Sequence, residues 1–224
     1  MTIKELANYI DLTLLKPEVT QSAIEDFLKN ALKYPFASVC IPPCYVRLAA
    51  SLLEGSGIKV GTVIGFPLGY QTSETKKTGA KEAIKNGAHE IDMVMNISAF
   101  KSADFTIVED EMSEIVSVVS GNIVKVIIET GYLTEGEKAV ACDMVVNSGA
   151  HYVKTSTGFG PGYATVEDVT LLAEKAAGWI EVKASGGIKN LSDAMKMIDA
   201  GAKRLGTSSG IEIVEELQKE LKVK

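Results

Sequence analysis

The chain has 224 residues, of which 46% are hydrophobic and 23% are charged, so it is long enough to bury the core of one large domain. Its 23 Lys and Arg residues against 29 Asp and Glu residues give a net charge of −6, which excludes the basic face that non-specific nucleic-acid binding requires. A small anionic substrate remains compatible with this balance, because one phosphate needs only local hydrogen-bond donors.

The N-terminus and the cysteines indicate the compartment. Residues 1–6 contain no apolar segment of the kind found in signal peptides, and every apolar run is too short to span a bilayer. Cys40, Cys44 and Cys142 are too few, and odd in number, for a disulfide framework, and no histidines lie at the spacing of a zinc site. We therefore expect a cytoplasmic protein with no membrane partner, no metal and no cofactor.

Eight short β-rich runs alternate with longer amphipathic stretches along the sequence. In chain order the predicted strands are Tyr9–Leu14, Ala37–Ile41, Val60–Ile64, Glu90–Asn96, Val124–Glu129, Tyr152–Ser156, Ile180–Ser185 and Arg204–Ser208. Their starts recur roughly every 23 to 35 residues, the length of one strand–helix unit. This alternation predicts a parallel sheet covered by helices.

The stretches between the strands have helical spacing and helical ends. Apolar residues recur at i, i+4, i+5 and i+8 in the segment 23–31, and glycine follows three of the predicted helices at Gly87, Gly149 and Gly201. Glycine can adopt the left-handed conformation that ends many helices. No linker rich in proline or serine interrupts the series, so we expect residues 1–224 to form a single domain.

Polar residues of the predicted strands fall on one face, which favours a closed (β/α)8 barrel over an open doubly wound sheet. Side chains alternate between the two faces of a strand, so the apolar set should meet the helices and the polar set should point into the barrel. The residues assigned to the interior face are Glu90, Asp92, Asn96, Lys125, Glu129, Lys154, Ser156, Glu181, Lys183 and Ser185.

Charged side chains in a barrel interior are costly to desolvate, so their presence indicates a function. The candidate group is Asp11, Asp92, Lys125, Lys154 and Lys183. Lys154 and Lys183 lie on adjacent strands, and a neighbouring like charge lowers the pKa of a lysine. A lowered pKa makes lysine nucleophilic near pH 7, because a lysine with the ordinary pKa of about 10.4 is almost entirely protonated there.

The same residues also fit an ion-pair network with no catalytic role. In that interpretation Asp92 neutralises one lysine, and Glu129 or Asp11 neutralises the other. The loops after the last two strands favour catalysis. Residues 184–188 (ASGGI) and 206–210 (GTSSG) each precede a predicted helix, at the two positions where barrels commonly bind phosphate. Residues 157–162 (TGFGPG), after Lys154, fit either a loop that covers a ligand or an ordinary connection.

Six motifs in the same order resemble the family of deoxyribose-phosphate aldolases. They are IDLTLLK at 10–16, EIDMV at 90–94, VKVIIET at 124–130, YVKTSTG at 152–158, VKASGGI at 182–188 and LGTSS at 205–209. The similarity runs from about Asp11 to Ser209, which is nearly the whole chain. Such a resemblance implies a metal-independent reversible aldol reaction that converts 2-deoxyribose 5-phosphate to acetaldehyde and glyceraldehyde 3-phosphate through a lysine Schiff base.

The resemblance also implies roles for individual residues. Lys154 would form the Schiff base, Lys183 would lower its pKa, and Asp92 would move protons through a bound water. The supporting residues implied by the family pattern are Asp11, Thr13 and Lys125, with Cys40 close to the substrate. The phosphate-binding residues implied by it are Gly158, Gly186, Gly187, Ser208 and Ser209. Relatives are commonly dimers, so a homodimer or higher homo-oligomer is expected.

The sequence departs from the family pattern at two places, and two other functions are also compatible with it. Phe159 replaces a lysine that some relatives have beside the phosphate, so backbone donors should carry more of the binding. The tail Lys222–Lys224 lacks the terminal tyrosine of some relatives, and no role is assigned to it. A phosphosugar isomerase or epimerase would share the phosphate loops without a nucleophilic lysine. A non-catalytic phosphosugar-binding barrel would use the interior lysines only for structure.

Overall fold

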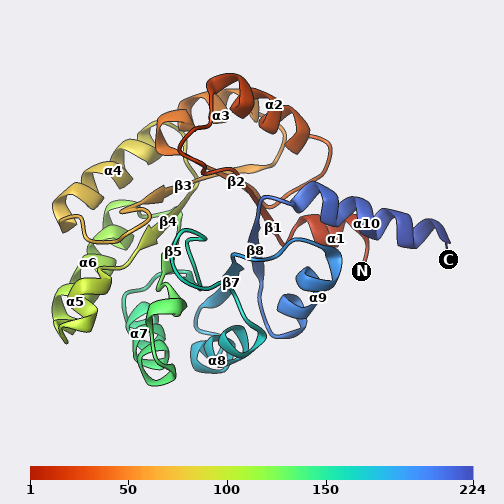
Figure 1. The fold of residues 1–224 in the computed structure, drawn as a ribbon. Coiled ribbons are helices and arrows are strands. Elements are labelled where there is room, and N and C mark those ends of the chain that lie inside the picture. Colours follow the sequence, from red (N-terminus) through yellow and green to blue (C-terminus); the bar gives the residue numbers. More distant parts are fainter. Residues whose placement is uncertain (224) are drawn as a thin grey trace.

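A computed structural model describes residues 1–223 and confirms the predicted (β/α)8 barrel (Figure 1). Within these residues, eight parallel strands pair in chain order, and the last strand pairs with the first to close the sheet. The strands are β1 (Ile10–Thr13), β2 (Ser38–Ile41), β3 (Lys59–Ile64), β4 (Glu90–Val94), β5 (Ile123–Ile127), β6 (Tyr152–Lys154), β7 (Glu181–Ser185) and β8 (Arg204–Thr207).

All eight predicted strands are present. β4, β5 and β6 end two residues earlier than predicted, and β1 and β8 end one residue earlier. β4 ends at Val94, and the side chain of Asn96 instead accepts a hydrogen bond from the backbone N–H of Ala99 and caps the next helix. β5 ends at Ile127, and Glu129 has a left-handed backbone with φ of 53°. The assignment of Asn96 and Glu129 to the interior face of a strand was therefore wrong, because each side chain bonds to a loop or helix end.

Helices follow the strands and cover the outside of the barrel. They are α1 (Ile3–Ala7), α2 (Gln21–Ala31), α3 (Val46–Leu52), α4 (Ser73–Lys85), α5 (Ile97–Lys101), α6 (Phe105–Val118), α7 (Glu135–Asn147), α8 (Val166–Ala176), α9 (Leu191–Asp199) and α10 (Gly210–Val223), with short 3₁₀ turns η1 (Pro43–Tyr45) and η2 (Thr130–Tyr132). Threonine begins many of them: the hydroxyls of Thr20, Thr72, Thr134 and Thr165 each accept a backbone hydrogen bond from the first turn. The glycines predicted to end helices at 87, 149 and 201 all have positive φ.

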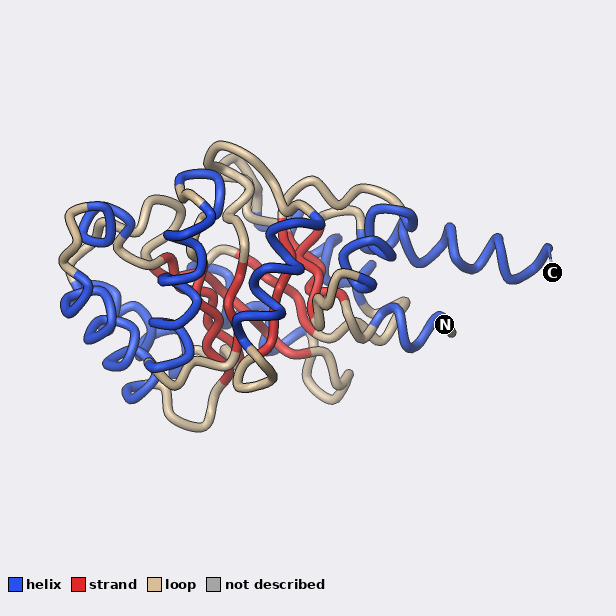
Figure 2. The backbone as a smooth tube through the Cα atoms, turned by 90° about the horizontal axis from the view of Figure 1, so that it is seen from below, coloured by secondary structure: helices blue, strands red, loops and turns tan. Residues whose placement is uncertain are grey.

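The core lies between the strands and the ring of helices. On β5 and just beyond it, Val124, Val126 and Ile128 face outward and are fully buried, each contributing roughly 1.5–3 kcal/mol by leaving water. Figure 2 shows the strands at the centre with helices around them, and α10 extending beyond the barrel on the side of the N-terminus. The opposite faces of the strands point into the barrel, as the alternation of polar residues predicts.

Among the helices described in residues 1–223, none has the length and apolar character needed to cross a membrane. Of the tail Lys222–Lys224, residue 224 lies outside the described residues. The remainder belongs to the end of α10, which contacts α1 and β1. Helices α1 and α10 therefore pack together on one side of the barrel.

Candidate active site

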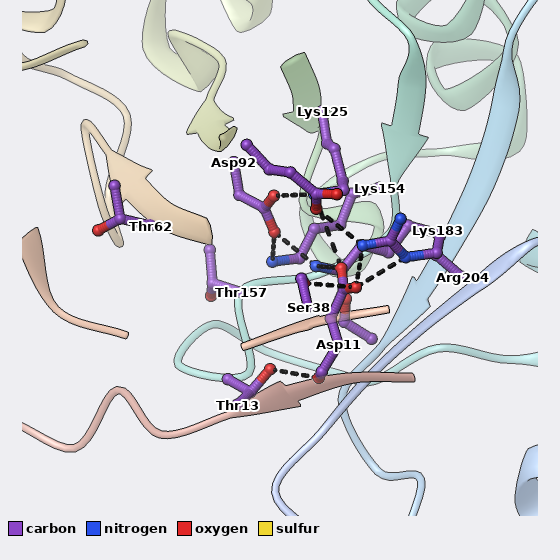
Figure 3. Close-up of polar contacts among 12 residues, drawn as sticks. Asp11, Thr13, Ser38, Thr62, Asp92, Lys125, Lys154, Thr157, Lys183 and Arg204 are labelled. Carbon is purple, nitrogen blue, oxygen red and sulfur yellow. Dashed lines mark hydrogen bonds and ion pairs between the residues drawn. The ribbon is translucent and has the colours of Figure 1, made fainter. Parts of the chain in front are cut away.

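Seven charged side chains meet inside the barrel, and we call them the barrel cluster. They are Asp11, Glu90, Asp92, Lys125, Lys154, Lys183 and Arg204, and all are buried. Figure 3 shows their polar ends converging, joined by hydrogen bonds and ion pairs. The fold thus brings together the five charged residues that the sequence indicated as the candidate group. Glu90 and Arg204 are two further members of the cluster.

Asp92 of β4 lies at the centre of the three lysines. Its Oδ2 accepts hydrogen bonds from Lys154 Nζ at 2.8 Å and from Lys183 Nζ at 2.7 Å, and its Oδ1 accepts one from Lys125 Nζ at 2.9 Å. Parallel register explains this meeting, because Lys154 pairs with Lys183 across β6 and β7, and Asp92 pairs with Lys125 across β4 and β5. Among residues 1–223, Asp92 is therefore the single carboxylate that contacts both candidate catalytic lysines.

Asp11 of β1 and Arg204 of β8 form the other side of the cluster. Asp11 Oδ2 lies 2.5 Å from Lys183 Nζ, and Asp11 Oδ1 accepts hydrogen bonds from Ser38 Oγ at 2.7 Å and from Arg204 Nε at 2.7 Å. Arg204 also reaches Glu90 Oε2 at 2.7 Å. Arg204 was not predicted from the sequence, although it is the first residue of the predicted strand 204–208.

The number of charges in the cluster singles out Lys154. Four cationic side chains share three carboxylates. Within the described part of the chain, Lys154 contacts only one carboxylate oxygen, whereas Lys125 and Lys183 each contact at least two carboxylates. Burial lowers the pKa of Lys154 below the ordinary lysine value, and the charge on Lys183 lowers it further while Asp92 opposes the shift. Loss of a proton from Lys154 leaves the remaining charges balanced.

The neighbouring groups are held in their charged forms. Burial opposes the charge on Lys183, but Asp11 and Asp92 outweigh it and raise the pKa of Lys183 above the ordinary value. Burial likewise opposes ionisation of Asp92, but the three lysines hold the pKa of Asp92 well below its usual range. The charge on Lys183 lowers the pKa of Lys154, which is the direction predicted from the sequence, and burial lowers that pKa more.

A cavity of about 370 Å³ opens above Lys154 at the carboxyl ends of the strands. Its lining comprises Thr13, Leu14, Leu15, Lys16, Lys154, Thr157, Gly158, Phe159, Tyr163, Ser185, Gly186, Gly187, Ile188, Lys189, Gly206, Thr207 and Ser208. A larger groove of about 790 Å³ lies between the β2 and β3 loops and α4, and Lys154 does not line it. The smaller cavity is the candidate active site, because it reaches the barrel cluster.

Most of the residues predicted to bind phosphate line this cavity, and one does not. Gly158, Gly186, Gly187 and Ser208 lie in its wall, whereas the backbone N–H of Ser209 donates to Thr207 Oγ1 at 2.9 Å. Ser209 lies between the end of β8 and the start of α10. Two lysines that sequence analysis left without a role, Lys16 and Lys189, line the cavity and add positive charge; each follows a strand end, which is the available sequence signal.

The other predicted residues lie at different depths. Thr13 lines the cavity, and its hydroxyl donates to the carbonyl of Asp11 at 2.9 Å. Cys40 is buried on β2, and burial raises the pKa of its thiol to about 11. Glu181 was expected inside the barrel but is exposed, because it is the first residue of β7.

Phe159 lies at the rim of the cavity, where some relatives have lysine. Its ring meets the ring of Phe66 edge-on at a centroid distance of 5.3 Å, and Phe66 belongs to the loop after β3. This contact joins two loops that are far apart in sequence across the mouth of the barrel. Ser185 Oγ lies in the same wall and has no hydrogen-bond partner among residues 1–223.

A (β/α)8 barrel with a buried, weakly paired lysine beneath a cavity at its catalytic end has the arrangement of an enzyme that forms a Schiff base. Comparisons with known proteins agree. Residues 6–216 match the sequence profile of the family described as "DeoC/LacD family aldolase". Two relatives named deoxyribose-phosphate aldolase, from Thermoanaerobacter sp. (strain X514) and Clostridium kluyveri, are 54% and 52% identical to this chain. Each alignment covers 96% of this chain, with 97% and 99% of the respective relative.

Solved structures give the same result. A protein described as "QR15, an Aldolase" superimposes with a TM-score of 0.94 at 44% identity, covering 97% of this chain and 98% of that one. The deoxyribose phosphate aldolase from Aeropyrum pernix superimposes with a TM-score of 0.91 at 34% identity, covering 98% and 93%. The chain belongs to the DeoC/LacD family of aldolases. This membership favours a carbon–carbon lyase over the isomerase and the non-catalytic barrel considered above.

Proposed function

We propose that this chain is a class I aldolase that reversibly cleaves 2-deoxy-D-ribose 5-phosphate to acetaldehyde and glyceraldehyde 3-phosphate. The observation that carries the proposal is Lys154, which lines the cavity, contacts one carboxylate oxygen and has a lowered pKa. The names of the relatives supply the substrate. The reaction then follows from the residues around Lys154.

In the first step the neutral amine of Lys154 attacks the aldehyde carbon of the open-chain sugar. Loss of water gives an iminium, which restores a positive charge at the nitrogen beside Asp92 Oδ2. Lys183 stays protonated between Asp11 and Asp92. Its positive charge lowers the pKa of Lys154 and so favours the neutral amine. The barrel cluster therefore accommodates both the neutral amine and the charged intermediate with little rearrangement.

In the second step the bond between C2 and C3 breaks, and its electron pair moves toward the iminium to form an enamine. The proton of the C3 hydroxyl leaves at the same time, so that C3 becomes the aldehyde carbon of glyceraldehyde 3-phosphate, which departs; we assign this proton transfer to Asp92 acting through a bound water. A proton then returns to C2, and hydrolysis of the iminium releases acetaldehyde and frees Lys154. Asp92 suits this role because it is the carboxylate that touches both lysines.

The phosphate end of the substrate is assigned to the loops after β6, β7 and β8. Backbone N–H groups at Gly158, Gly186 and Gly187 and the hydroxyl of Ser208 line that part of the cavity. Lys16 and Lys189 supply positive charge that Phe159 does not. Of the predicted set, Ser209 has the weakest support, since its N–H is already bonded within the β8 turn.

The test measures both products when the protein is incubated with 2-deoxyribose 5-phosphate. We expect cleavage by the wild type and by a Lys203→Met control, whose lysine is exposed in the turn before β8. We expect cleavage by Lys154→Met to fall by at least about 1,000-fold, because no other lysine lining the cavity belongs to the barrel cluster. Wild-type protein that forms neither product would contradict the proposal.

We further propose that residues 1–224 act as one aldolase domain and that the protein self-associates as a homodimer or larger homo-oligomer. The first part is supported by the contact of α10 with β1 and α1, which joins the two ends of the chain. The second part is supported by the deoxyribose phosphate aldolase from Aeropyrum pernix, whose structure is described as tetrameric. Light scattering after size-exclusion chromatography tests self-association, and a monomeric mass across micromolar concentrations would contradict it.

A further inference from the structure

A buried carboxylate that the proposed reaction does not use lies beside the cavity. Glu129 follows β5, is 1% exposed and has a left-handed backbone with φ of 53°. Among residues 1–223, no lysine or arginine forms an ion pair with it, and burial raises the pKa of its carboxyl group. A glutamate with this backbone and no counter-ion needs other contacts to hold it in place.

Those contacts come from the loop after β6. The backbone N–H of Thr157 donates to both carboxylate oxygens of Glu129 at 3.2 Å, and the hydroxyl of Thr157 donates to Oε2. The same hydroxyl accepts hydrogen bonds from the N–H groups of Phe159 at 3.0 Å and Gly160 at 3.3 Å. One carboxylate therefore fixes the segment 157–160 through a short chain of hydrogen bonds.

Close packing reinforces this attachment. A Cβ atom added to Gly160 would lie 2.8 Å from Glu129 Cδ, and one added to Gly131 would lie 1.6 Å from the carbonyl oxygen of Pro161. Glycine is thus required at both points where the β5 and β6 loops touch. The two loops form one unit, with the carboxylate of Glu129 between them.

The attached segment forms a wall of the cavity. Thr157, Gly158 and Phe159 line it together with Lys154, and Gly158 lies among the donors assigned to the phosphate. We propose that Glu129 is a positioning residue that holds the segment 157–160 in the shape that lets the cavity prefer a phosphorylated over an unphosphorylated substrate. This inference rests on the proposed function, because it assigns a determinant of substrate choice to the same site.

The experiment compares kcat and KM for 2-deoxyribose 5-phosphate and for 2-deoxyribose in three variants. Glu129→Gln keeps the size of the side chain but replaces one acceptor oxygen with a donor. Thr157→Val removes the hydroxyl that links Glu129 to the N–H groups of residues 159 and 160. Glu111→Gln is the matched control, because Glu111 is also a buried glutamate with a raised pKa but lies on α6, away from the cavity.

We expect Glu129→Gln and Thr157→Val each to lower the preference for the phosphorylated substrate about tenfold, as loss of a charged hydrogen bond would. The change should appear mainly as a higher KM for that substrate, with kcat on 2-deoxyribose within about twofold of wild type. Glu111→Gln should melt at a lower temperature and keep the wild-type preference. All three should still give a borohydride-reduced adduct with acetaldehyde on Lys154.

Two outcomes would overturn the inference. An unchanged preference in Glu129→Gln and Thr157→Val, with melting temperatures lowered as in the control, would make Glu129 a structural residue only. An equal loss on both substrates, together with loss of the adduct, would place Glu129 in the chemistry of Lys154. If Glu129→Gln does not fold, Thr157→Val alone decides, because it leaves the carboxylate in place. Wild-type protein without any preference for phosphate would instead count against the proposed function.

Discussion

The protein buries lysines and carboxylates in two places, and the two places differ in charge and access. Lys76 of α4 and Glu111 of α6 form a closed pair outside the barrel, 2.7 Å apart and fully shielded from water, with Lys76 Nζ also donating to the carbonyl of Val94 at 2.9 Å. The barrel cluster has one more cation than carboxylates, and Lys154, one of its members, lines the cavity.

Burial of charged side chains does not by itself indicate that they take part in catalysis. Burial lowers the pKa of Lys76 as it lowers that of Lys154. Lys76, however, has its own carboxylate and a backbone acceptor and lines neither the cavity nor the larger groove, whereas Lys154 shares one oxygen of Asp92 with Lys183. An unshared ion pair holds helices together, while a shared, unbalanced cluster can lose and regain a proton.

Removing the carboxylate that the lysines share should give the largest effect. Asp92→Asn leaves Lys154 and Lys183 without their common negative charge and removes the proposed proton carrier, so kcat for 2-deoxyribose 5-phosphate should fall about 1,000-fold. Steady-state kinetics check this, with Glu111→Gln as the buried-carboxylate control. Loss of activity of similar size in the control would erase the distinction between the two regions.

Lys183→Leu should lower activity near pH 7 on the order of 100-fold, with partial recovery at alkaline pH. Without the charge on Lys183, Oδ2 of Asp92 pairs with Lys154 alone and the pKa of Lys154 rises, so a higher pH is needed to deprotonate the amine. A profile of kcat/KM against pH from 6 to 10 checks this, because kcat/KM should begin to rise at a higher pH in Lys183→Leu than in wild type. Activity equal to wild type at neutral pH would remove Lys183 from the account.

In the closed pair, loss of one partner should affect stability and spare the reaction. Lys76→Met leaves Glu111 buried without its cation and should lower the free energy of unfolding by about 3 kcal/mol. Urea unfolding gives the stability, and kcat should stay within about twofold of wild type. A large loss of kcat with unchanged stability would mean that this pair, too, serves the reaction.

The smallest effect expected is in the stability of the two regions at acid pH. Asp11 and Asp92 have lowered pKa values in the folded protein, so their stabilisation is present above the ordinary value of 3.8 and is lost as pH falls below it. Glu111 has a raised pKa, so its contribution is present below 4.5 and is lost as pH rises through the raised value. We therefore expect the free energy of unfolding, measured with urea between pH 2.5 and 6, to fall less steeply with decreasing pH in Asp92→Asn than in wild type. In Glu111→Gln the free energy of unfolding should fall below pH 3.8 as steeply as in wild type. An equally weak pH dependence in Glu111→Gln would contradict the assignment of this stabilisation to Asp92.

The barrel was predictable from the sequence because its strands repeat at even spacing and alternate polar and apolar residues. Lys154, Lys183 and Asp92 were predictable for the same reason, since polar residues on inward faces of neighbouring strands must meet. Arg204 follows the same rule as the first residue of the predicted strand 204–208, but it was not included in the predicted group. Its pairing with Asp11 depends on closure of β8 onto β1, which no local pattern reveals.

The loop contacts could not be predicted in the same way. Glu129 continues the polar alternation of β5, so the sequence places it inside the barrel, whereas a left-handed backbone turns it toward Thr157. That conformation depends on contacts between the loops after β5 and β6, which are far apart in sequence. The bond from the Ser209 N–H to the Thr207 hydroxyl within the β8 turn is likewise not visible in the sequence, and the role of Ser209 in phosphate binding stays a prediction.

The most direct test of the central claim is to incubate the protein with acetaldehyde and sodium borohydride and to map the modified peptides by mass spectrometry. Lys154 alone combines a lowered pKa with access to the cavity among the lysines of the barrel cluster, so we predict one reduced ethyl adduct on Lys154 and an unmodified Lys76. Adducts scattered over surface lysines, with Lys154 unmodified, would contradict the claim and leave the barrel cluster as structural as the pair between α4 and α6.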